Sequence, residues 1–449
     1  MNGYFETRVG SDLAEKIESR RAVVGIIGLG YVGLPLAAAC VRGGFRTRGF
    51  DVDAGKISIL NGGSSYIDAV GSEEIARYVL SGRFNATSEF AELSECDVII
   101  ICVPTPLSRH REPDLHYIEI TTECIARAIR EGQLIVLEST TYPGTTDEVV
   151  KPILEKTGLK SGSHFFLGFS PEREDPGNTS FKTATIPKIV AGDGPAASFL
   201  VETFYAAVVD KVVVVSSPKV SEAVKITENV FRAVNIALVN ELKVIYEAMG
   251  IDVWEVIDAA ATKPFGYMPF YPGPGLGGHC IPIDPFYLTW KSREYGLSTR
   301  FIELAGEINV SMPRYVIGRL EGALDRFANL SLGSARILML GLAYKKNVSD
   351  IRESPSLELM ELLERRQSKV DYHDPLVPII PPTREHSRFA GRKSVDLTAA
   401  TCEAYDAIVV ATDHDSIDYQ LISKNSKIII DTRNVFARKG ILGGNIVKS

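Results

Sequence analysis

Residues 22–33 read Ala-Val-Val-Gly-Ile-Ile-Gly-Leu-Gly-Tyr-Val-Gly. The apolar part of this stretch predicts a buried strand, and the small apolar residues 34–42 predict the helix that follows it. Gly28, Gly30 and Gly33 stand between the two with the spacing GxGxxG. The first glycine permits the turn, the second lets a pyrophosphate approach the backbone, and the third lets helix and strand pack closely. The stretch therefore predicts the first unit of a dinucleotide-binding α/β fold.

The second expected strand, residues 45–50, ends at two carboxylates, Asp51 and Asp53. At this position, about 20 residues beyond the glycines, an acid binds the ribose hydroxyls of a dinucleotide. Asp51 fits the strand end better, but the pattern does not separate the two. A carboxylate here repels a 2′-phosphate, which favours NAD over NADP, while the nearby Arg48 argues the other way. The competing interpretation is a glycine turn that binds nothing.

The rest of the chain alternates strands and helices in two regions. In the first, the apolar runs predict a parallel, doubly wound sheet; they are residues 98–103, 134–137, 165–169, 188–190 and 212–215. Apolar residues then recur at three- and four-residue steps from Val224 to Ile245, which is typical of a long helix that spans two domains or forms a dimer core. A second α/β region begins near Ala335.

These patterns predict the α/β class, with two Rossmann-like doubly wound domains joined by a long central helix and a helical middle domain. The expected domains are a dinucleotide-binding domain over 1–217, a central domain over 218–330 and a C-terminal domain over 331–449. Three domains are ordinary for 449 residues. The net charge of -7 argues against a nucleic-acid partner. No apolar run approaches the roughly 20 residues that cross a bilayer, and no signal peptide is evident, so we expect a cytoplasmic protein without a membrane partner.

One of the six cysteines differs from the others in its surroundings. Cys280 lies in the run Pro272-Gly-Pro-Gly-Leu-Gly-Gly-His-Cys-Ile-Pro-Ile-Asp284, whose glycines and prolines impose special turns. A thiol there, four residues from a carboxylate, is typical of a positioned nucleophile. The remaining cysteines show no CxxC pairing and are interpreted as reduced, buried structural thiols: Cys40, Cys96, Cys102, Cys124 and Cys402. The seven histidines form no ligand-spaced cluster, so no metal site is expected.

The motifs and their order resemble those of the nucleotide-sugar 6-dehydrogenase family, which includes UDP-glucose and GDP-mannose dehydrogenases. The resemblance covers nearly the whole chain, from Gly28 to Arg433. Its segments are residues 28–36, Cys102-Val-Pro-Thr-Pro106, Glu138-Ser-Thr-Thr-Tyr-Pro-Gly-Thr145, Ser170-Pro-Glu-Arg173, Lys225 to Asn229, the Cys280 loop, and Tyr344-Lys-Lys to Arg352-Glu-Ser. The resemblance implies that NAD binds the N-terminal domain and that a nucleotide-sugar is held between the central and C-terminal domains.

A nicotinamide cofactor together with a nucleophilic thiol predicts oxidation through a covalent thioester. In the implied reaction, the C6 alcohol of the sugar loses a hydride to NAD+ and becomes an aldehyde, which the Cys280 thiolate attacks to give a thiohemiacetal. This adduct loses a second hydride to another NAD+, and the resulting thioester is hydrolysed to a carboxylate. An aldehyde alone resists further hydride loss, whereas the thiohemiacetal is again a donor at the alcohol level.

Five further residues complete the expected catalytic set. Lys225 can stabilise the oxyanions that form at C6, Asn229 one helical turn on can fix a water or an oxyanion, and Asp284 can orient a water or tune Lys225. By resemblance, Glu172 is a base for thioester hydrolysis and Thr140 binds a water. The competing interpretations are a solvated helix face for Lys225 and Asn229, a turn cap for Asp284, a surface carboxylate for Glu172 and an ordinary strand end for Thr140. The group that takes the first proton is left open, with water as one candidate.

The resemblance also implies two sets of binding residues. The cofactor set is Gly28, Gly30, Tyr31, Val32, Gly33, Asp51, Asp53, Val103, Pro104, Thr105, Ser139, Thr140 and Arg352. The substrate set is Glu172, Arg173, Lys225, Asn229, Arg232, Tyr267, Tyr271, Gly277, Tyr344, Lys345 and Arg433. Cations after a strand-end glycine suit a diphosphate, and aromatic residues suit the base or sugar. Ordinary surface charge and loop packing are the competing interpretations.

The sequence of the cysteine loop indicates which UDP-sugar is the substrate. His279 precedes Cys280 and an isoleucine precedes Asp284, whereas the UDP-glucose branch has serine and lysine there. With the longer lead segment, residues 263–272, these features resemble the UDP-N-acetylhexosamine branch, whose products feed bacterial surface polysaccharides such as lipopolysaccharide O-antigens. UDP-N-acetyl-D-glucosamine is favoured, followed by the galacto and manno epimers, with UDP-glucose as a further alternative.

Two other classes of protein compete with this interpretation. A single-step NAD-dependent hydroxy-acid dehydrogenase would need neither Cys280 nor the second α/β region, and a non-catalytic nucleotide-sugar sensor would have no need of a thiol. The long central helix predicts a homodimer or a higher homo-oligomer, unless its open face is covered within the chain.

Overall fold

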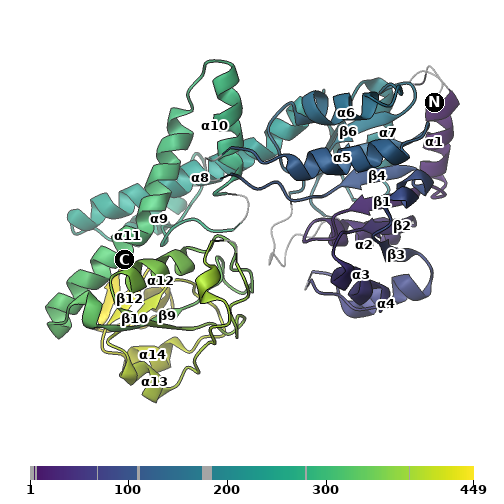
Figure 1. The fold of residues 1–449 in the computed structure, drawn as a ribbon. Coiled ribbons are helices and arrows are strands. Elements are labelled where there is room, and N and C mark those ends of the chain that lie inside the picture. Colours follow the sequence, from purple (N-terminus) through teal and green to yellow (C-terminus); the bar gives the residue numbers. More distant parts are fainter. Residues whose placement is uncertain are drawn as a thin grey trace. The chain divides into compact units, whose positions relative to one another are not determined.

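The computed structural model describes residues 5, 8–67, 69–108, 112–173, 185–278, 281–383 and 385–449. The chain divides into two compact units. Unit 1 is Met1–Glu228 with Phe286–Leu297, and unit 2 is Asn229–Pro285 with Ser298–Ser449. Each unit is built around one sheet (Figure 1).

Unit 1 contains an eight-stranded sheet in the order β3-β2-β1-β4-β5-β6-β7-β8. Its strands are β1 (Val23–Ile27), β2 (Arg46–Phe50), β3 (Phe84–Thr87), β4 (Val98–Ile101), β5 (Leu134–Leu137), β6 (Phe166–Phe169), β7 (Lys188–Gly192) and β8 (Val212–Val214). All neighbours pair in parallel except β6 and β7, which pair antiparallel through Gly168 with Gly192 and Phe169 with Ala191. The expected parallel sheet is confirmed apart from this pair. An antiparallel strand near the edge of a parallel sheet is common, and residue composition does not encode strand direction.

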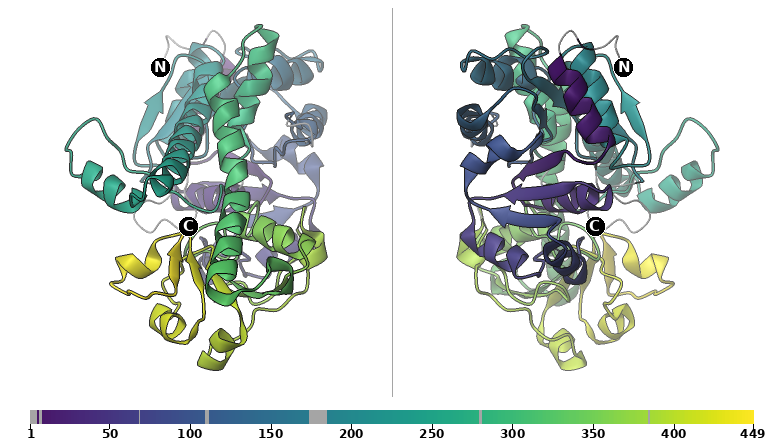
Figure 2. Two further views of the ribbon diagram at one scale, coloured as in Figure 1. Left: turned by 90° about the vertical axis from the view of Figure 1, so that its left-hand side faces the viewer. Right: turned by 90° about the vertical axis from the view of Figure 1, so that its right-hand side faces the viewer.

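Helices cover both faces of this sheet. Its strands carry apolar side chains on both faces, and each face therefore packs against a layer of helices. One face packs against α1 (Arg8–Glu18), α2 (Gly33–Arg42) and α7 (Pro195–Tyr205). The other packs against α5 (His116–Ala128) and α6 (Lys151–Glu155). Figure 2 shows α1 lying alongside α7. The remaining helices are α3 (Ala54–Asn61), α4 (Ser72–Leu80), η1 (Phe90–Glu95) and the π-helical turn η2 (Thr146–Val150).

Unit 2 contains a five-stranded, wholly parallel sheet in the order β10-β9-β11-β12-β13. The strands are β9 (Arg336–Leu340), β10 (Lys369–His373), β11 (Ala407–Val410), β12 (Ile429–Asp431) and β13 (Ile446–Lys448). One face packs against α11 (Arg300–Ala328) and α12 (Pro355–Arg365), the other against α13 (Ala399–Ala404), α14 (Tyr419–Asn425) and α15 (Val435–Arg438). The predicted second Rossmann-like sheet is confirmed. Short turns η3 (Leu332–Ser334) and η4 (Ser387–Phe389) complete this part.

Three helices form the middle of the chain. The expected long helix is α8 (Pro218–Ala248), and it is followed by α9 (Val253–Ala261) and α10 (Asp284–Glu294). Within unit 2, α8 and α9 pack through Val239, Trp254 and Ile257. In the described part of the chain, no helix combines the length and apolarity needed to span a membrane.

Candidate active site

The glycine turn after β1 is shaped for a close approach to its backbone. Gly28 has φ +90°, in the left-handed region that favours glycine. A Cβ on Gly33 would lie 1.9 Å from the carbonyl oxygen of Gly28, so only glycine fits there. Gly30 has open space at its Cβ position. In the described residues, no side chain caps the first turn of α2, where Val32 is the N-cap. The start of α2, beside the expected positions Tyr31 and Val32, therefore carries no side-chain cap from the described residues.

The two candidate ribose acids have different surroundings. Asp51 follows β2 and is buried; its Oδ2 accepts a 2.9 Å hydrogen bond from the Leu29 N–H, within the glycine turn. Asp53 is exposed and caps α3 by accepting from Gly55 and Lys56 N–H groups. Arg48 forms ion pairs with Glu92 (2.7 Å) and Glu95 (2.9 Å). Because the guanidinium of Arg48 is paired with these two carboxylates, its charge no longer argues for NADP over NAD.

Two loops follow the adjacent strands β4 and β5, and polar contacts join them. Ser139, after β5, donates from its Oγ to the carbonyl oxygen of Val103, after β4, at 2.8 Å. Tyr287 on α10 donates to the carbonyl oxygen of Thr105 in the loop after β4. Beyond β5, Lys225 Nζ donates to Thr140 Oγ1 at 2.5 Å. Since the carboxyl ends of neighbouring parallel strands share one edge of the sheet, these loops lie beside the glycine turn. The structure thus brings Lys225 and Thr140 together with the expected cofactor loops of unit 1.

Glu172 is buried, so its interpretation as a surface carboxylate is wrong. It follows β6, and its Oε2 lies 3.0 Å from Lys188 Nζ while its Oε1 accepts from the Arg173 N–H at 2.7 Å. The Arg173 guanidinium in turn forms an ion pair with Glu228 at 2.6 Å. The carboxylate of Glu172 is therefore held in one orientation at the same sheet edge.

Sequence analysis missed the group that holds Glu172. Lys188 is only 4% exposed, and its Nζ also lies 2.9 Å from Glu138 Oε2, while the Tyr205 hydroxyl donates to Oε1 of the same carboxylate. Burial alone would lower the pKa of Lys188, but the carboxylates of Glu138 and Glu172 raise it above its usual value, so the ammonium stays charged. The signal was present in the sequence, because Lys188 is the one charged residue of the otherwise apolar strand β7.

Unit 2 contains the remaining expected catalytic residues. Asn229 Nδ2 donates to Asp284 Oδ2 at 2.7 Å, and both side chains are buried. They are 55 positions apart, and the structure brings them into direct contact. Cys280 and His279 lie outside the described residues.

A cavity of about 240 Å³ in unit 2 gathers several expected substrate residues. Its lining residues are Trp254, Tyr271, Pro272, Tyr344, Lys345, Lys346, Asp413, Arg433 and Arg438. Four cations thus face one carboxylate, which suits a diphosphate. Tyr271 stacks on Trp254, with ring centroids 5.5 Å apart and planes 13° from parallel.

Sequence analysis did not name Trp254, Lys346 or Arg438 in this cavity. Lys346 had a signal, since it is the second lysine of the Tyr344-Lys-Lys motif. Two expected substrate residues, Arg232 and Tyr267, are exposed and are not among its lining residues. Arg352, which was expected to contact the cofactor, is exposed as well. Gly277 contributes by its size, because a Cβ there would lie 2.6 Å from Tyr344 Cβ.

The comparison with known proteins matches three successive segments to one family. Residues 22–209 match its NAD binding domain, residues 219–311 its central domain and residues 338–438 its UDP binding domain. The chain belongs to the UDP-glucose/GDP-mannose dehydrogenase family. The family resemblance, the NAD cofactor and the nucleotide-sugar dehydrogenase activity expected from the sequence are confirmed: the protein is an NAD-dependent UDP-sugar dehydrogenase.

Relatives in this family share most of the chain. UDP-N-acetyl-D-glucosamine 6-dehydrogenase of Pseudomonas aeruginosa is 36% identical, over 87% of this chain and 90% of its own. UDP-N-acetyl-D-mannosamine dehydrogenase of Pyrococcus horikoshii is 35% identical, over 92% of this chain and 95% of its own. The solved structure of the UDP-D-ManNAc dehydrogenase from Pyrococcus horikoshii matches with a TM-score of 0.84 and 34% identity, covering 95% of this chain and 98% of that one.

NAD fits the residues that this dehydrogenase presents in unit 1. The open space at Gly30 and the uncapped start of α2 accept a pyrophosphate, and the acid after β2 accepts ribose hydroxyls. NAD supplies the hydride acceptor of the reaction. The chain would hold it with the glycine turn at the pyrophosphate and with the loops after β4 and β5 at the sheet edge.

The other cysteines of the dehydrogenase are partly as expected. Cys40, Cys96 and Cys402 are buried, whereas Cys102 and Cys124 are only half-buried, so the expectation of full burial is wrong for these two. Burial raises the pKa of Cys96 to about 12, which keeps that thiol protonated. Burial thus supports the structural interpretation of Cys40, Cys96 and Cys402.

Glu222 is a further residue that sequence analysis missed. It lies on α8, is fully buried, and accepts hydrogen bonds from the loop after β5: from the Gly144 N–H, and from the N–H (2.9 Å) and Oγ1 (2.7 Å) of Thr146. It thereby joins the helix that carries Lys225 to the loop that carries Thr140. Nothing in the local sequence pattern distinguishes it from a solvated helix residue.

We expect Glu222 to make stability depend on pH. Burial raises the pKa of its carboxyl to about 7, although the hydrogen bonds from Gly144 and Thr146 oppose the shift. Because the folded-state pKa lies above the unfolded one, its contribution is complete below about pH 4.3 and is lost as the pH rises through 7. The loss is about 3 kcal/mol.

Chemical denaturation of wild type and Glu222→Gln at pH 5 and pH 8 tests this expectation. The stability of the wild type relative to the variant should fall by about 3 kcal/mol between the two pH values. The exposed Glu202→Gln is the matched control, with the same change of charge on α7. A wild-type-to-Glu222→Gln difference that stays constant with pH would contradict the expectation.

Proposed function

We propose that this enzyme oxidises the C6 hydroxymethyl group of UDP-N-acetyl-D-glucosamine to the carboxylate, with two hydride transfers per substrate, for surface polysaccharide biosynthesis. The observation that carries the proposal is the cavity in unit 2, where Lys345, Lys346, Arg433 and Arg438 converge. Four cations and the stacked Trp254–Tyr271 pair suit the diphosphate and the ring systems of a UDP-sugar. The sequence of the cysteine loop and the name of the Pseudomonas relative favour the N-acetylglucosamine substrate.

In the proposed chemistry, a hydride first leaves C6, and the alcohol becomes an aldehyde as its hydroxyl proton is released. The Cys280 thiolate then adds to the aldehyde carbon, a C–S bond forms, and the oxygen takes up a proton. A second hydride leaves this thiohemiacetal as its hydroxyl proton is released, which gives the thioester. Water attacks the thioester carbonyl, the C–S bond breaks, and the carboxylate and the free thiolate are released.

The other residues are assigned by what they contact. Lys225, hydrogen-bonded to Thr140, stabilises the negative oxygen at C6, and Thr140 fixes a water beside it. Glu172, oriented by Lys188, accepts the proton of the water that hydrolyses the thioester. Asp284 accepts from the Nδ2 of Asn229 and thereby orients the amide, so that Asn229 Oδ1 can act as an acceptor. Asp51 is assigned to the adenosine ribose, because Asp53 caps α3.

Initial rates with a panel of UDP-sugars test the substrate. We expect the highest kcat/KM for UDP-N-acetyl-D-glucosamine, lower values for the galacto and manno epimers, and the lowest for UDP-glucose. Mass spectrometry of the product should show the sugar gaining one oxygen and losing two hydrogens. A higher kcat/KM for another UDP-sugar would transfer the assignment to that sugar, and no oxidation of any UDP-sugar would refute the proposal.

We also propose that the enzyme is a homodimer or a higher homo-oligomer. On α8 the chain exposes Phe231, Leu238 and Ile245 at spacings of seven residues, and the exposed Met249 follows directly after the helix. Such spacing on one helix is typical of a helix–helix contact. The molar mass in solution, measured by light scattering, tests this: a monomer at micromolar concentration would contradict it.

A further inference from the structure

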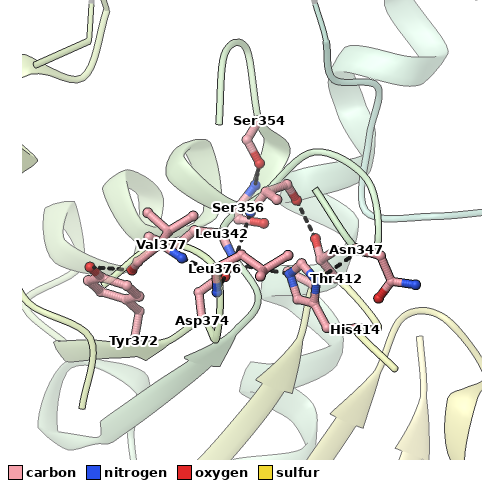
Figure 3. Close-up of polar contacts among 12 residues, drawn as sticks. Leu342, Asn347, Ser354, Ser356, Tyr372, Asp374, Leu376, Val377, Thr412 and His414 are labelled. Carbon is pink, nitrogen blue, oxygen red and sulfur yellow. Dashed lines mark hydrogen bonds and ion pairs between the residues drawn. The ribbon is translucent and has the colours of Figure 1, made fainter. Parts of the chain in front are cut away.

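A buried polar pair in unit 2, His414 and Asp374, is outside every residue set described above (Figure 3). His414 is 0% exposed and Asp374 is 2% exposed. Asp374 follows β10 and His414 comes shortly after β11, the two neighbours of β9 in the sheet. His414 Nε2 lies 3.1 Å from Asp374 Oδ2. The pair therefore crosses the carboxyl edge of the sheet, over the loop that follows β9.

The carboxylate of Asp374 is completely occupied by the chain itself. Besides His414, its donors are the N–H groups of Leu342 (2.6 Å) and Ala343 (3.2 Å) on Oδ2, and those of Leu376 (2.8 Å) and Val377 (3.0 Å) on Oδ1. Five donors leave no lone pair for a ligand. Asp374 follows the second strand of its sheet, as Asp51 does in unit 1, but all five donors to its carboxylate come from the chain.

The hydrogen bonds of the imidazole define its tautomer. His414 Nδ1 lies 3.0 Å from the backbone N of Asn347. An N–H can only donate, so Nδ1 is the acceptor and the ring proton is on Nε2, directed at Asp374. Burial alone would raise the pKa of Asp374, but the hydrogen bonds from His414 and the backbone hold it below its usual value, so an ionised acceptor faces that proton. The ring is neutral and links the end of β10 to residue 347.

The segment between these two anchors lines the cavity. Asp374 holds Leu342 and Ala343 at one end, and His414 holds Asn347 at the other. Asn347 has φ +61°, in the left-handed region that asparagine adopts more readily than most residues with a side chain. Between the anchors are residues 344–346, all three of which line the cavity of about 240 Å³. The pair is thus one contact removed from the cationic groups.

We propose that His414 is a positioning residue for the nucleotide: its neutral, Nε2-protonated ring fixes residues 344–346 so that Lys345 and Lys346 face the diphosphate. The proposal rests on the proposed function, because it takes the cavity as the diphosphate site. Without the Nδ1 acceptor, the part-buried N–H of Asn347 loses its hydrogen bond to the imidazole and the segment gains freedom. Binding must then order that segment, and affinity falls.

Two variants distinguish the role of the Nδ1 acceptor from that of the Nε2 donor. His414→Asn keeps an acceptor near the position of Nδ1, whereas His414→Gln keeps a donor toward Asp374 and loses that acceptor. Titration calorimetry of the full-length enzyme with UDP as the probe should give a Kd about tenfold higher for His414→Gln, the effect of one lost hydrogen bond. His414→Asn should stay within about threefold of wild type. In steady-state kinetics, His414→Gln should raise KM for the UDP-sugar more than it lowers kcat, and leave KM for NAD unchanged.

Asn347→Gly gives a control that does not alter the buried histidine. It keeps the N–H that donates to His414 but removes the side-chain contacts of Asn347 with Asp415. We expect UDP affinity within about threefold of wild type. A tenfold loss in this variant, or unchanged UDP affinity in His414→Gln with only a lower Tm, would overturn the positioning role. Wild-type enzyme that does not bind UDP would instead refute the assignment of the cavity.

Discussion

The Cys280→Ser enzyme should form no detectable uronate, with a fall in carboxylate production of about 10³-fold or more, because a serine hydroxyl is a far weaker nucleophile than a thiolate near neutral pH. Without the adduct, the aldehyde offers no alcohol-level hydride donor for the second oxidation. Quenched-flow sampling with a carbonyl-trapping reagent should therefore detect, at most, aldehyde. Product analysis by mass spectrometry checks both outcomes.

Cys124→Ser is the matched control for this experiment. Cys124 is a half-buried thiol on α5 with no assigned role in the reaction. Its replacement should leave kcat within about twofold, since removing a thiol at a site without function costs little. A Cys280→Ser enzyme that produces uronate at the wild-type rate would exclude the thioester route.

The second large effect is expected at Lys188. Lys188→Met should destabilise the protein by about 3–5 kcal/mol, because it leaves the carboxylates of Glu138 and Glu172 buried without their cation. In a unit of this size the Tm should fall by roughly 10 °C. The same variant should slow thioester hydrolysis, since Glu172 loses the group that orients it. Differential scanning calorimetry and a single-turnover assay measure the two effects.

Lys151→Met serves as the comparison for Lys188→Met. Lys151 Nζ forms a 2.7 Å ion pair with Asp193, but the lysine side chain is 33% exposed. Surface pairs contribute about 0–1 kcal/mol, so this variant should remain close to wild type. Equal destabilisation by the two substitutions would mean that the buried ion pairs of Lys188 contribute no more to the free energy of folding than the partly exposed pair of Lys151.

Local patterns predicted those parts of the fold that depend on neighbouring residues. The glycine turn of residues 28–33 was found because each glycine meets a steric need within a few residues of itself. The long helix α8 was found from its apolar periodicity. The antiparallel pairing of β6 and β7 was missed, because strand direction depends on the path of the chain rather than on composition.

For the site, the sequence identified residue types better than partners. Asn229 and Asp284 were both named, yet their direct hydrogen bond joins positions 55 apart and has no local signature. Lys188 could have been found, since a lysine in a fully buried strand needs a buried counter-charge. Glu222 gave no signal, because its partner Thr146 lies 76 positions away in the sequence. Trp254 gave none, because the ring that stacks on it belongs to Tyr271, in a loop outside its helix.

The amount of NADH formed for each molecule of UDP-N-acetyl-D-glucosamine consumed is the most direct test of the central claim. The absorbance of NADH at limiting substrate, with chromatographic counting of the remaining UDP-sugar, gives the ratio. A ratio of two, with UDP-uronate as the product, is the result we predict. A ratio of one, with an aldehyde or ketone as the product, would contradict the two-step oxidation through Cys280.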